Sequence, residues 1–106
     1  MSYVKEIFEQ AQIDAKKHTL EKMGEDVMIF PCGFAWVDLE CKKTDKLGKE
    51  LEKEGIMSWD PYKKSYYFWV GDYNQSMMHK EAHAEKLAEI LSADLFREFK
   101  MNSRMD

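Results

Sequence analysis

The chain has 106 residues, with 16 Lys and Arg against 20 Asp and Glu, so its formal net charge is −4. This length suits one compact domain over residues 1–106 and excludes a large multidomain enzyme. Hydrophobic residues make up 44% of the chain, which is typical of a folded protein, and the acidic balance disfavours a nonspecific nucleic-acid coat protein.

The first half of the chain predicts two helices separated by a strand. Apolar residues at steps of three and four indicate an amphipathic helix over 2–23, with Ser2 as its N-cap. Residues 27–39 predict one long strand, interrupted by a bend or bulge at Pro31 and Gly33. A short helix follows from Asp45, a good N-cap, to Gly55, a good stop signal.

The second half predicts a hairpin, a helix and a last strand. Residues 56–59 and 65–70 are β-prone runs on either side of a turn-forming segment, which is typical of a hairpin. Ser76 is placed to cap a third helix, whose apolar residues share one face. Residues 95–101 alternate in part and predict a final strand before a polar tail over 102–106.

The resulting order, α–β–α–β–β–α–β, predicts an α+β fold. Without its first helix it matches the split βαβ order of ferredoxin-like domains. We therefore expect a ferredoxin-like core over 27–106 with an extra N-terminal helix over 2–23. In that arrangement the first strand lies beside the strand that contains residues 65–70.

Strand alternation predicts a cluster of aromatic side chains on one face of this sheet. Ala35, Val37 and Leu39 form the more apolar set of the first strand and should face the helices. The opposite face then receives Phe34, Trp36 and Asp38 from the first strand, together with Tyr67 and Trp69 from its neighbour.

Three coverings of this aromatic face are compatible with the sequence. The first is nucleic-acid bases that stack on the rings, although residues 64–68 match the motif of RNA-recognition domains poorly. The second is a partner protein or a second copy of the chain. The third is the helix over 2–23, whose own apolar stripe also needs burial.

No set of catalytic or metal-ligating residues stands out. His79 and His83 have the spacing of a helical zinc pair, but no third ligand is identifiable, and two solvent-facing histidines are the simpler explanation. Cys32 is either a reactive thiol at a bend or a buried structural one, and its odd separation from Cys41 argues against a disulfide. We therefore expect no enzyme activity, no metal and no cofactor.

The chain also lacks the marks of export or membrane insertion. Its longest apolar run is residues 66–70, far short of a membrane-spanning helix, and charges occupy the place of a signal-peptide core. These features predict a cytoplasmic protein. The loop over 71–76 leads into a helix N-terminus that could bind an anion, but Ser76 as an ordinary cap explains the same residues.

Three stretches resemble a family of small uncharacterised proteins encoded by bacteriophages and prophages. They are FPCGFAWV at 30–37, QSM at 75–77 followed by KEAHA at 80–84, and SRMD at 103–106. The resemblance spans roughly residues 27–106 and implies only a setting: the host-cell cytoplasm, where small accessory proteins bind host factors. It supplies no catalytic residue.

Together these features predict a non-enzymatic accessory protein that binds a host protein or self-associates through its aromatic sheet face. The alternative is a nucleotide or single-stranded nucleic-acid binder that uses the same rings with Lys63 and Lys64. Arg104 could contact a carboxylate or a phosphate. The predicted binding residues are Phe34, Trp36, Tyr67, Trp69, Tyr73 and Arg104.

Overall fold

The structure, a computed structural model, describes residues 3–24, 33–71, 73 and 76–105. The helices are α1 (Tyr3–Met23), α2 (Lys46–Lys53) and α3 (Met77–Leu95), and the strands are β1 (Gly33–Glu40), β2 (Ser58–Asp60), β3 (Ser65–Trp69) and β4 (Lys100–Met105). The strands form one antiparallel sheet in the order β2-β3-β1-β4. The predicted α+β class is confirmed, as is the position of β1 beside β3.

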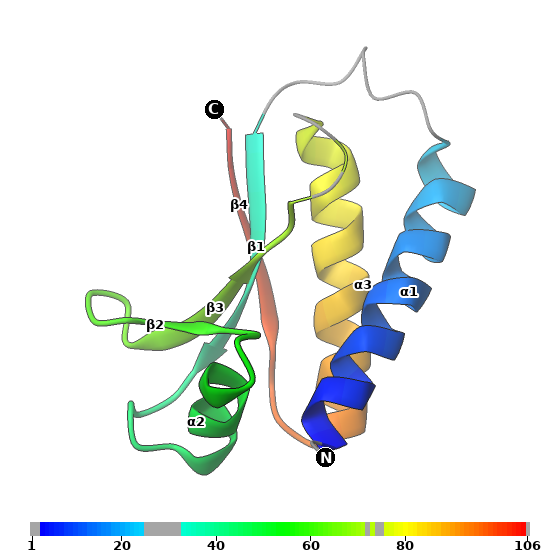
Figure 1. The fold of residues 1–106 in the computed structure, drawn as a ribbon. Coiled ribbons are helices and arrows are strands. Elements are labelled where there is room, and N and C mark those ends of the chain that lie inside the picture. The colour runs from blue at the N-terminus through cyan, green and yellow to red at the C-terminus, as the bar shows by residue number, and fades with distance from the viewer. Residues whose placement is uncertain (1–2, 25–32, 72, 74–75, 106) are drawn as a thin grey trace.

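All three helices lie on the same side of the sheet. Figure 1 shows α1 and α3 side by side on that side, and Phe8 of α1 packs edge-on against Phe68 of β3 with ring centroids 4.9 Å apart. Gly48 of α2 lies against Tyr66, which belongs to the same sheet face as Phe68. The other sheet face, called the open face from here on, carries none of the three helices.

Of the three coverings compatible with the sequence, the structure excludes the helix over 2–23, because α1 lies on the other face of the sheet. The buried residues of α1 are Val4, Phe8, Ala11, Ala15 and Thr19. This stripe packs mainly along α3, where small alanines let two helix backbones approach closely, while Phe8 reaches past α3 to the sheet. Two amphipathic helices on one sheet face bury each other's stripes, so α1 gains nothing by crossing to the open face.

The caps of the helices agree with their sequences. Asp45 accepts a hydrogen bond from the backbone N–H of Gly48 at 3.1 Å, as an N-cap should, and Ser76 accepts one from the N–H of His79 at 3.3 Å. Gly24 has a φ of 76°, the left-handed conformation that ends a helix at little cost in glycine. These predicted helix ends are confirmed, whereas Ser2 lies outside the described residues.

Asp45 also ties α2 to the segment after α3. The Arg97 guanidinium donates to both carboxylate oxygens, with distances of 3.1 Å to Oδ1 and 2.9 Å to Oδ2. This fork-to-fork geometry is the strongest form of the Arg–carboxylate pair. Hydrogen bonding to Arg97 lowers the pKa of the Asp45 carboxyl, so the pair contributes stability at neutral pH and loses it as the carboxyl is protonated in acid.

The predicted position of the last strand needs correction. The last strand was expected over 95–101, but Leu95 ends α3, Phe96 takes a left-handed φ of 57°, and β4 runs from Lys100 to Met105. The predicted polar tail is therefore mostly strand, because pairing with β1 satisfies its backbone whatever its side chains. The first strand is described from Gly33, so its predicted beginning at 27–32 lies outside the described residues.

The hydrophobic core lies between the sheet and its helices. It includes Val37 and Leu39 of β1, Tyr66 of β3 and Leu87 and Leu91 of α3, all fully buried. The predicted alternation in β1 and β3 is thus confirmed. None of the helices in the described ranges combines the length and the apolar character that crossing a bilayer demands.

Candidate binding face

Four aromatic rings from β1 and β3 form one cluster on the open face. Trp36 pairs with Trp69 across the two strands, and their ring centroids are 4.7 Å apart. Phe34 and Tyr67 meet the same indole edge-on, at 5.6 Å and 6.5 Å. The predicted convergence of these four residues, the aromatic cluster, is confirmed, and Trp69 stands at its centre.

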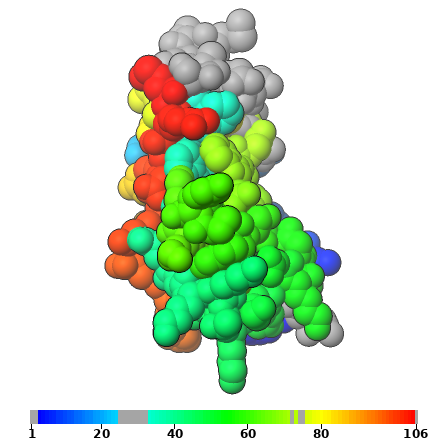
Figure 2. Space-filling view, turned by 90° about the vertical axis from the view of Figure 1, so that its left-hand side faces the viewer, coloured from blue at the N-terminus to red at the C-terminus, as the bar shows by residue number. Residues whose placement is uncertain are grey.

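Figure 2 views the molecule from the side of the open face, where β1, β3 and β4 lie at the surface. Within the cluster the two indoles differ sharply in exposure: Trp69 is 42% exposed, whereas Trp36 is only 8% exposed. The Trp36 ring is covered in part by the Lys63 ammonium, which lies 4.4 Å from its centroid in a cation–π contact. Trp69 is therefore the ring that the fold leaves available for contact.

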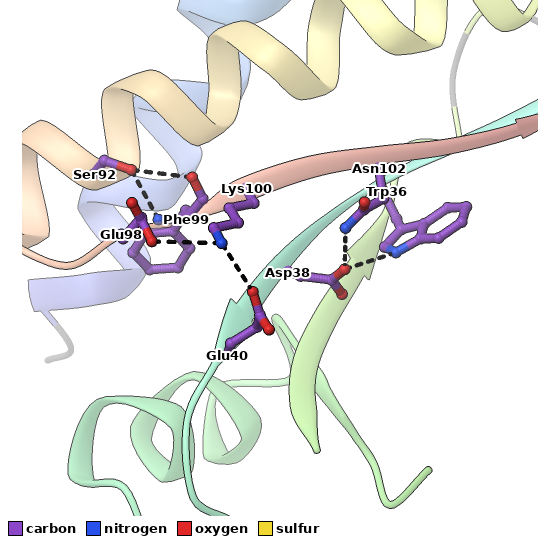
Figure 3. A network of polar contacts seen from close by, with 8 residues as sticks. All are labelled: Trp36, Asp38, Glu40, Ser92, Glu98, Phe99, Lys100 and Asn102. Carbon is purple, nitrogen blue, oxygen red and sulfur yellow. Dashed lines mark hydrogen bonds and ion pairs between the residues drawn. The ribbon is translucent and has the colours of Figure 1, made fainter. Parts of the chain in front are cut away.

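A buried carboxylate lies next to the cluster. Asp38 of β1 is 5% exposed, and its Oδ2 accepts hydrogen bonds from the Trp36 indole N–H at 3.0 Å and from the Asn102 side-chain amide of β4. Figure 3 shows both donors converging on this one oxygen. The other oxygen, Oδ1, has no hydrogen-bond partner in the part of the chain that the structure describes.

The two ends of the open face are basic or charge-paired. At one end the Arg104 guanidinium lies 5.4 Å from the Phe34 ring centroid, while the buried Lys80 of α3 lies at the same distance from this ring and donates to the Gly33 carbonyl. At the other end Lys100 pairs with Glu40 at 3.2 Å and with Glu98 at 3.7 Å, as drawn in Figure 3. Arg104 is therefore placed beside the aromatic cluster, on β4 rather than in a tail.

Tyr73 lies away from this cluster. Its hydroxyl is 2.7 Å from His83 Nδ1, and its ring lies 5.7 Å from that of His79, so it packs against α3 on the helix side. The structure thus brings together five of the six predicted binding residues and separates Tyr73 from them. The chain between β3 and α3 leads back to the helix layer, which carries Tyr73 with it.

His79 and His83 are buried, so the expectation of two solvent-facing histidines is wrong. His79 Nε2 donates to the Gly24 carbonyl at 2.8 Å and its Nδ1 is 2.8 Å from the Ser76 hydroxyl. His83 Nε2 donates to the Gln12 side-chain oxygen at 2.6 Å. With Tyr73 at its Nδ1, every ring nitrogen of the pair already has a hydrogen bond, and among the described residues no group of three candidate ligands could hold a metal.

Cys41 lies outside the aromatic cluster and packs against the hydrophobic core. Cys41 is a partly buried free thiol 3.7 Å from the Leu39 carbonyl, and burial raises the pKa of this thiol, which makes it less reactive at neutral pH. Cys32 lies outside the described residues, as do three residues of the loop predicted as an anion site, namely 72, 74 and 75.

Of the polar residues beside the aromatic cluster, the sequence placed only Asp38 on the correct face, and it did not identify Asp38 as a binding residue. The available signal was a carboxylate in the middle of a strand whose neighbours on the same face are aromatic. Ser65 is buried on the open face with its hydroxyl lacking a partner in the described part of the chain, and serine in a strand is too common to be noticed. Asn102 was hidden because the last strand was placed too early.

Comparisons of the chain with protein-family models, with curated proteins and with solved structures give no match.

The environment of Asp38 predicts an unusual pH dependence of stability. Burial raises the pKa of this carboxyl, against the opposing effect of its hydrogen bonds from Trp36 and Asn102. A raised pKa in the folded state means that folding favours the protonated form. The Asp38 contribution to the free energy of unfolding therefore falls as pH rises from about 3.9, the ordinary value, through the raised pKa.

We expect Asp38→Asn to remove this dependence. An asparagine oxygen can accept from Trp36 and Asn102 while its NH₂ group takes the position of Oδ1. Urea unfolding of both proteins at steps between pH 3 and pH 7 should show Asp38→Asn gaining stability relative to wild type as pH rises, then a plateau. A difference that is constant with pH, or that favours wild type increasingly as pH rises, would contradict this assignment.

Proposed function

We propose that this chain is a non-enzymatic binding protein whose open sheet face contacts a partner protein that presents basic side chains. The observation that carries the proposal is the exposed Trp69 indole at the centre of the aromatic cluster, on a sheet face that carries none of the three helices. Tryptophan surrounded by other rings is typical of the residues that dominate binding energy at protein interfaces. Contiguous exposed aromatic surface on a folded domain usually marks such an interface.

The charges around the cluster favour a basic partner. The small cavity beside Trp69 is lined by two carboxylates, those of Asp38 and Asp60, and by one ammonium group, that of Lys63. The charge balance around this cavity is therefore negative, whereas Arg104 lies beside Phe34 at the end of the open face. Complementary charge steers a cationic group of the partner toward the cavity.

A nucleotide or single-stranded nucleic acid is the second candidate. Arg104 beside Phe34 and Lys63 above Trp36 would place cations next to rings on which bases could stack. The buried carboxylate of Asp38 and the acidic neighbours would repel phosphates, which is why we rank this function below protein binding. Strongly salt-dependent quenching of tryptophan fluorescence by oligonucleotides would favour it.

The proposal also includes the ferredoxin-like fold and the phage setting predicted from the sequence. The central position of β1 and β3 in the sheet supports a ferredoxin-like core after α1. The resemblance of the chain's short motifs to phage and prophage proteins leads us to include in the proposal an accessory role in the cytoplasm of a host cell, with a host protein as the partner. Self-association of this chain is the competing arrangement that the experiment below separates.

We expect Trp69→Ala to weaken partner binding by about thirtyfold, the effect of losing an interface hot spot. The partner would first be captured from native lysate treated with nuclease, identified by mass spectrometry and purified. Its affinity for the wild-type chain and for Trp69→Ala would then be measured by calorimetry. The variant should remain folded, because this indole is 42% exposed and lies outside the hydrophobic core.

Phe96→Ala is the matched control. Phe96 is another large exposed ring, 90% exposed at the end of α3, and its loss should leave the affinity unchanged. Equal binding by wild type and Trp69→Ala would refute the proposed face. Light scattering of the purified chain supplies the second control, since a dimer that dissociates on Trp69→Ala would identify a second copy as the occupant.

A further inference from the structure

The open face contains a small cavity whose lining includes Asp38, and one carboxylate oxygen of Asp38 has no hydrogen-bond donor among the described residues. The cavity has a volume of about 130 Å³, which is room for a side-chain head group but not for a folded segment, and it is lined by Trp36, Asp38, Asp60, Lys63, Tyr67 and Trp69. An adjoining hollow shares Trp36, Asp38 and Lys63 with it and is also lined by Ser65. Asp38 Oδ1 and Ser65 Oγ, the two atoms without partners noted above, therefore lie in the same region of the face.

The group that would donate to Asp38 Oδ1 can be described by its charge and its hydrogen-bonding atoms. An ionised carboxylate has about four acceptor positions, and Asp38 uses only those of Oδ2, through Trp36 and Asn102. Leaving a buried charged acceptor without a donor is costly, and a cationic donor repays that cost best because it also neutralises the charge. The cavity therefore selects a positively charged group with N–H donors.

The rings of the cavity select the same kind of group. Lys63 already places its ammonium 4.4 Å from the centroid of Trp36, which shows that this ring face accepts a cation. Lys63 belongs to the exposed turn between β2 and β3, so its side chain can leave the cavity without disturbing the core. Asp60, at the start of this turn, adds a second carboxylate to the lining.

Between the two cationic side chains of proteins, the geometry favours arginine. A guanidinium is planar, so it can stack on the Trp69 indole while it directs N–H groups at Asp38 Oδ1. It is also less strongly hydrated than an ammonium, which lowers the cost of entering a site where the carboxylate is 5% exposed. An ammonium would satisfy the carboxylate but would gain less from the exposed indole.

We propose that Asp38, Trp36 and Trp69 form a subsite for an arginine guanidinium of the partner, which displaces the Lys63 ammonium on binding. This inference rests on the proposed function, since it names the partner side chain that the open face takes. Lys63 acts in it as an internal competitor that covers the subsite in the free protein.

The test uses acetyl-arginine amide as the probe and acetyl-citrulline amide as its neutral isostere. Both are titrated into the full ¹⁵N-labelled chain while the indole N–H resonances of Trp36 and Trp69 are followed by NMR. We expect saturable shifts with the arginine probe, at least about tenfold weaker binding of the citrulline probe, and a similar loss in Asp38→Asn, as the loss of a charge-assisted hydrogen bond implies. Lys63→Ala should bind the arginine probe more tightly than wild type.

Several results would overturn the subsite. They are equal shifts from the arginine and citrulline probes, unchanged binding in Asp38→Asn, or tighter binding of acetyl-lysine amide than of acetyl-arginine amide. Asp38→Asn is expected to fold, since it removes a buried charge and keeps the shape of the side chain, and its indole resonances report folding directly. Guanosine monophosphate serves as a further probe, because tighter binding of this nucleotide would favour base stacking instead.

The partner experiment keeps this inference separate from the proposed function. If Trp69→Ala weakens partner binding and Asp38→Asn does not, the binding face stands and the guanidinium subsite is refuted. If Trp69→Ala has no effect on the partner, the proposed function is refuted, while the probe titration still decides the chemistry of the subsite. Parallel losses in both variants, together with the arginine preference of the probe, would support both.

Discussion

Gly48→Ala is expected to destabilise the protein by about 3 kcal/mol, an overpacking effect larger than the gain in helix propensity. A Cβ atom at this position of α2 would overlap the aromatic ring of Tyr66. That ring is fully buried and is held at two further points: its hydroxyl donates to the Lys43 carbonyl at 2.5 Å, and Trp59 packs on it with centroids 5.0 Å apart. Because the ring cannot retreat, α2 must move away from the sheet.

Gly71→Ala is the control for this prediction, since no described atom lies within 4 Å of the position of its Cβ. Chemical unfolding of both variants at neutral pH should give a large loss for Gly48→Ala and a change within about 0.5 kcal/mol for Gly71→Ala. Similar stability of the two variants would mean that α2 does not rest on Tyr66 as described.

His79→Ala should cost about 3 kcal/mol of stability, the expected sum of lost burial and lost buried hydrogen bonds. The imidazole is fully buried and joins two segments that are distant in sequence, the end of α1 at Gly24 and the N-cap of α3 at Ser76. Its removal leaves a cavity and takes away the hydrogen bond to the Gly24 carbonyl. The unfolding midpoint in urea measures the effect at fixed pH.

His18→Ala separates this structural role from a general effect of losing a histidine. His18 is only partly buried on α1, so its replacement should change stability by less than about 1 kcal/mol. Wild-type stability in His79→Ala would show that the bond to Gly24 does not hold α1 to α3. Zinc should not stabilise the wild-type chain, because both histidines use their ring nitrogens for hydrogen bonds.

Local signals were sufficient for most of the elements. Asp45 and Ser76 cap the helices that they were predicted to cap, because a short side-chain oxygen before a helix satisfies free N–H groups whatever the surroundings. The alternation in β1 and β3 correctly placed Phe34, Trp36, Tyr67 and Trp69 on one face, since a strand has only two faces. The last strand was misplaced because its residues owe their conformation to pairing with β1, a contact distant in sequence.

The candidate binding face likewise contains residues that the sequence could place and residues that it could not. Its aromatic half follows from strand alternation, whereas its polar half depends on which strands are neighbours. Asp38 meets Asn102 only because β4 pairs with β1, and Lys63 reaches Trp36 only because the turn after β2 folds over the sheet. Neither contact has a local sequence signal, so both had to come from the tertiary structure.

The amino-acid sequence by itself determined the α+β class, the order of the elements and the two faces of β1 and β3, because caps, turns and side-chain periodicity act over a few residues. Only the tertiary structure decided that α1 packs on α3 rather than on the aromatic face, that His79 and His83 are buried, and that Asp38 has an oxygen without a described partner. These outcomes depend on which surfaces of distant segments bury one another best, a competition that no local pattern encodes.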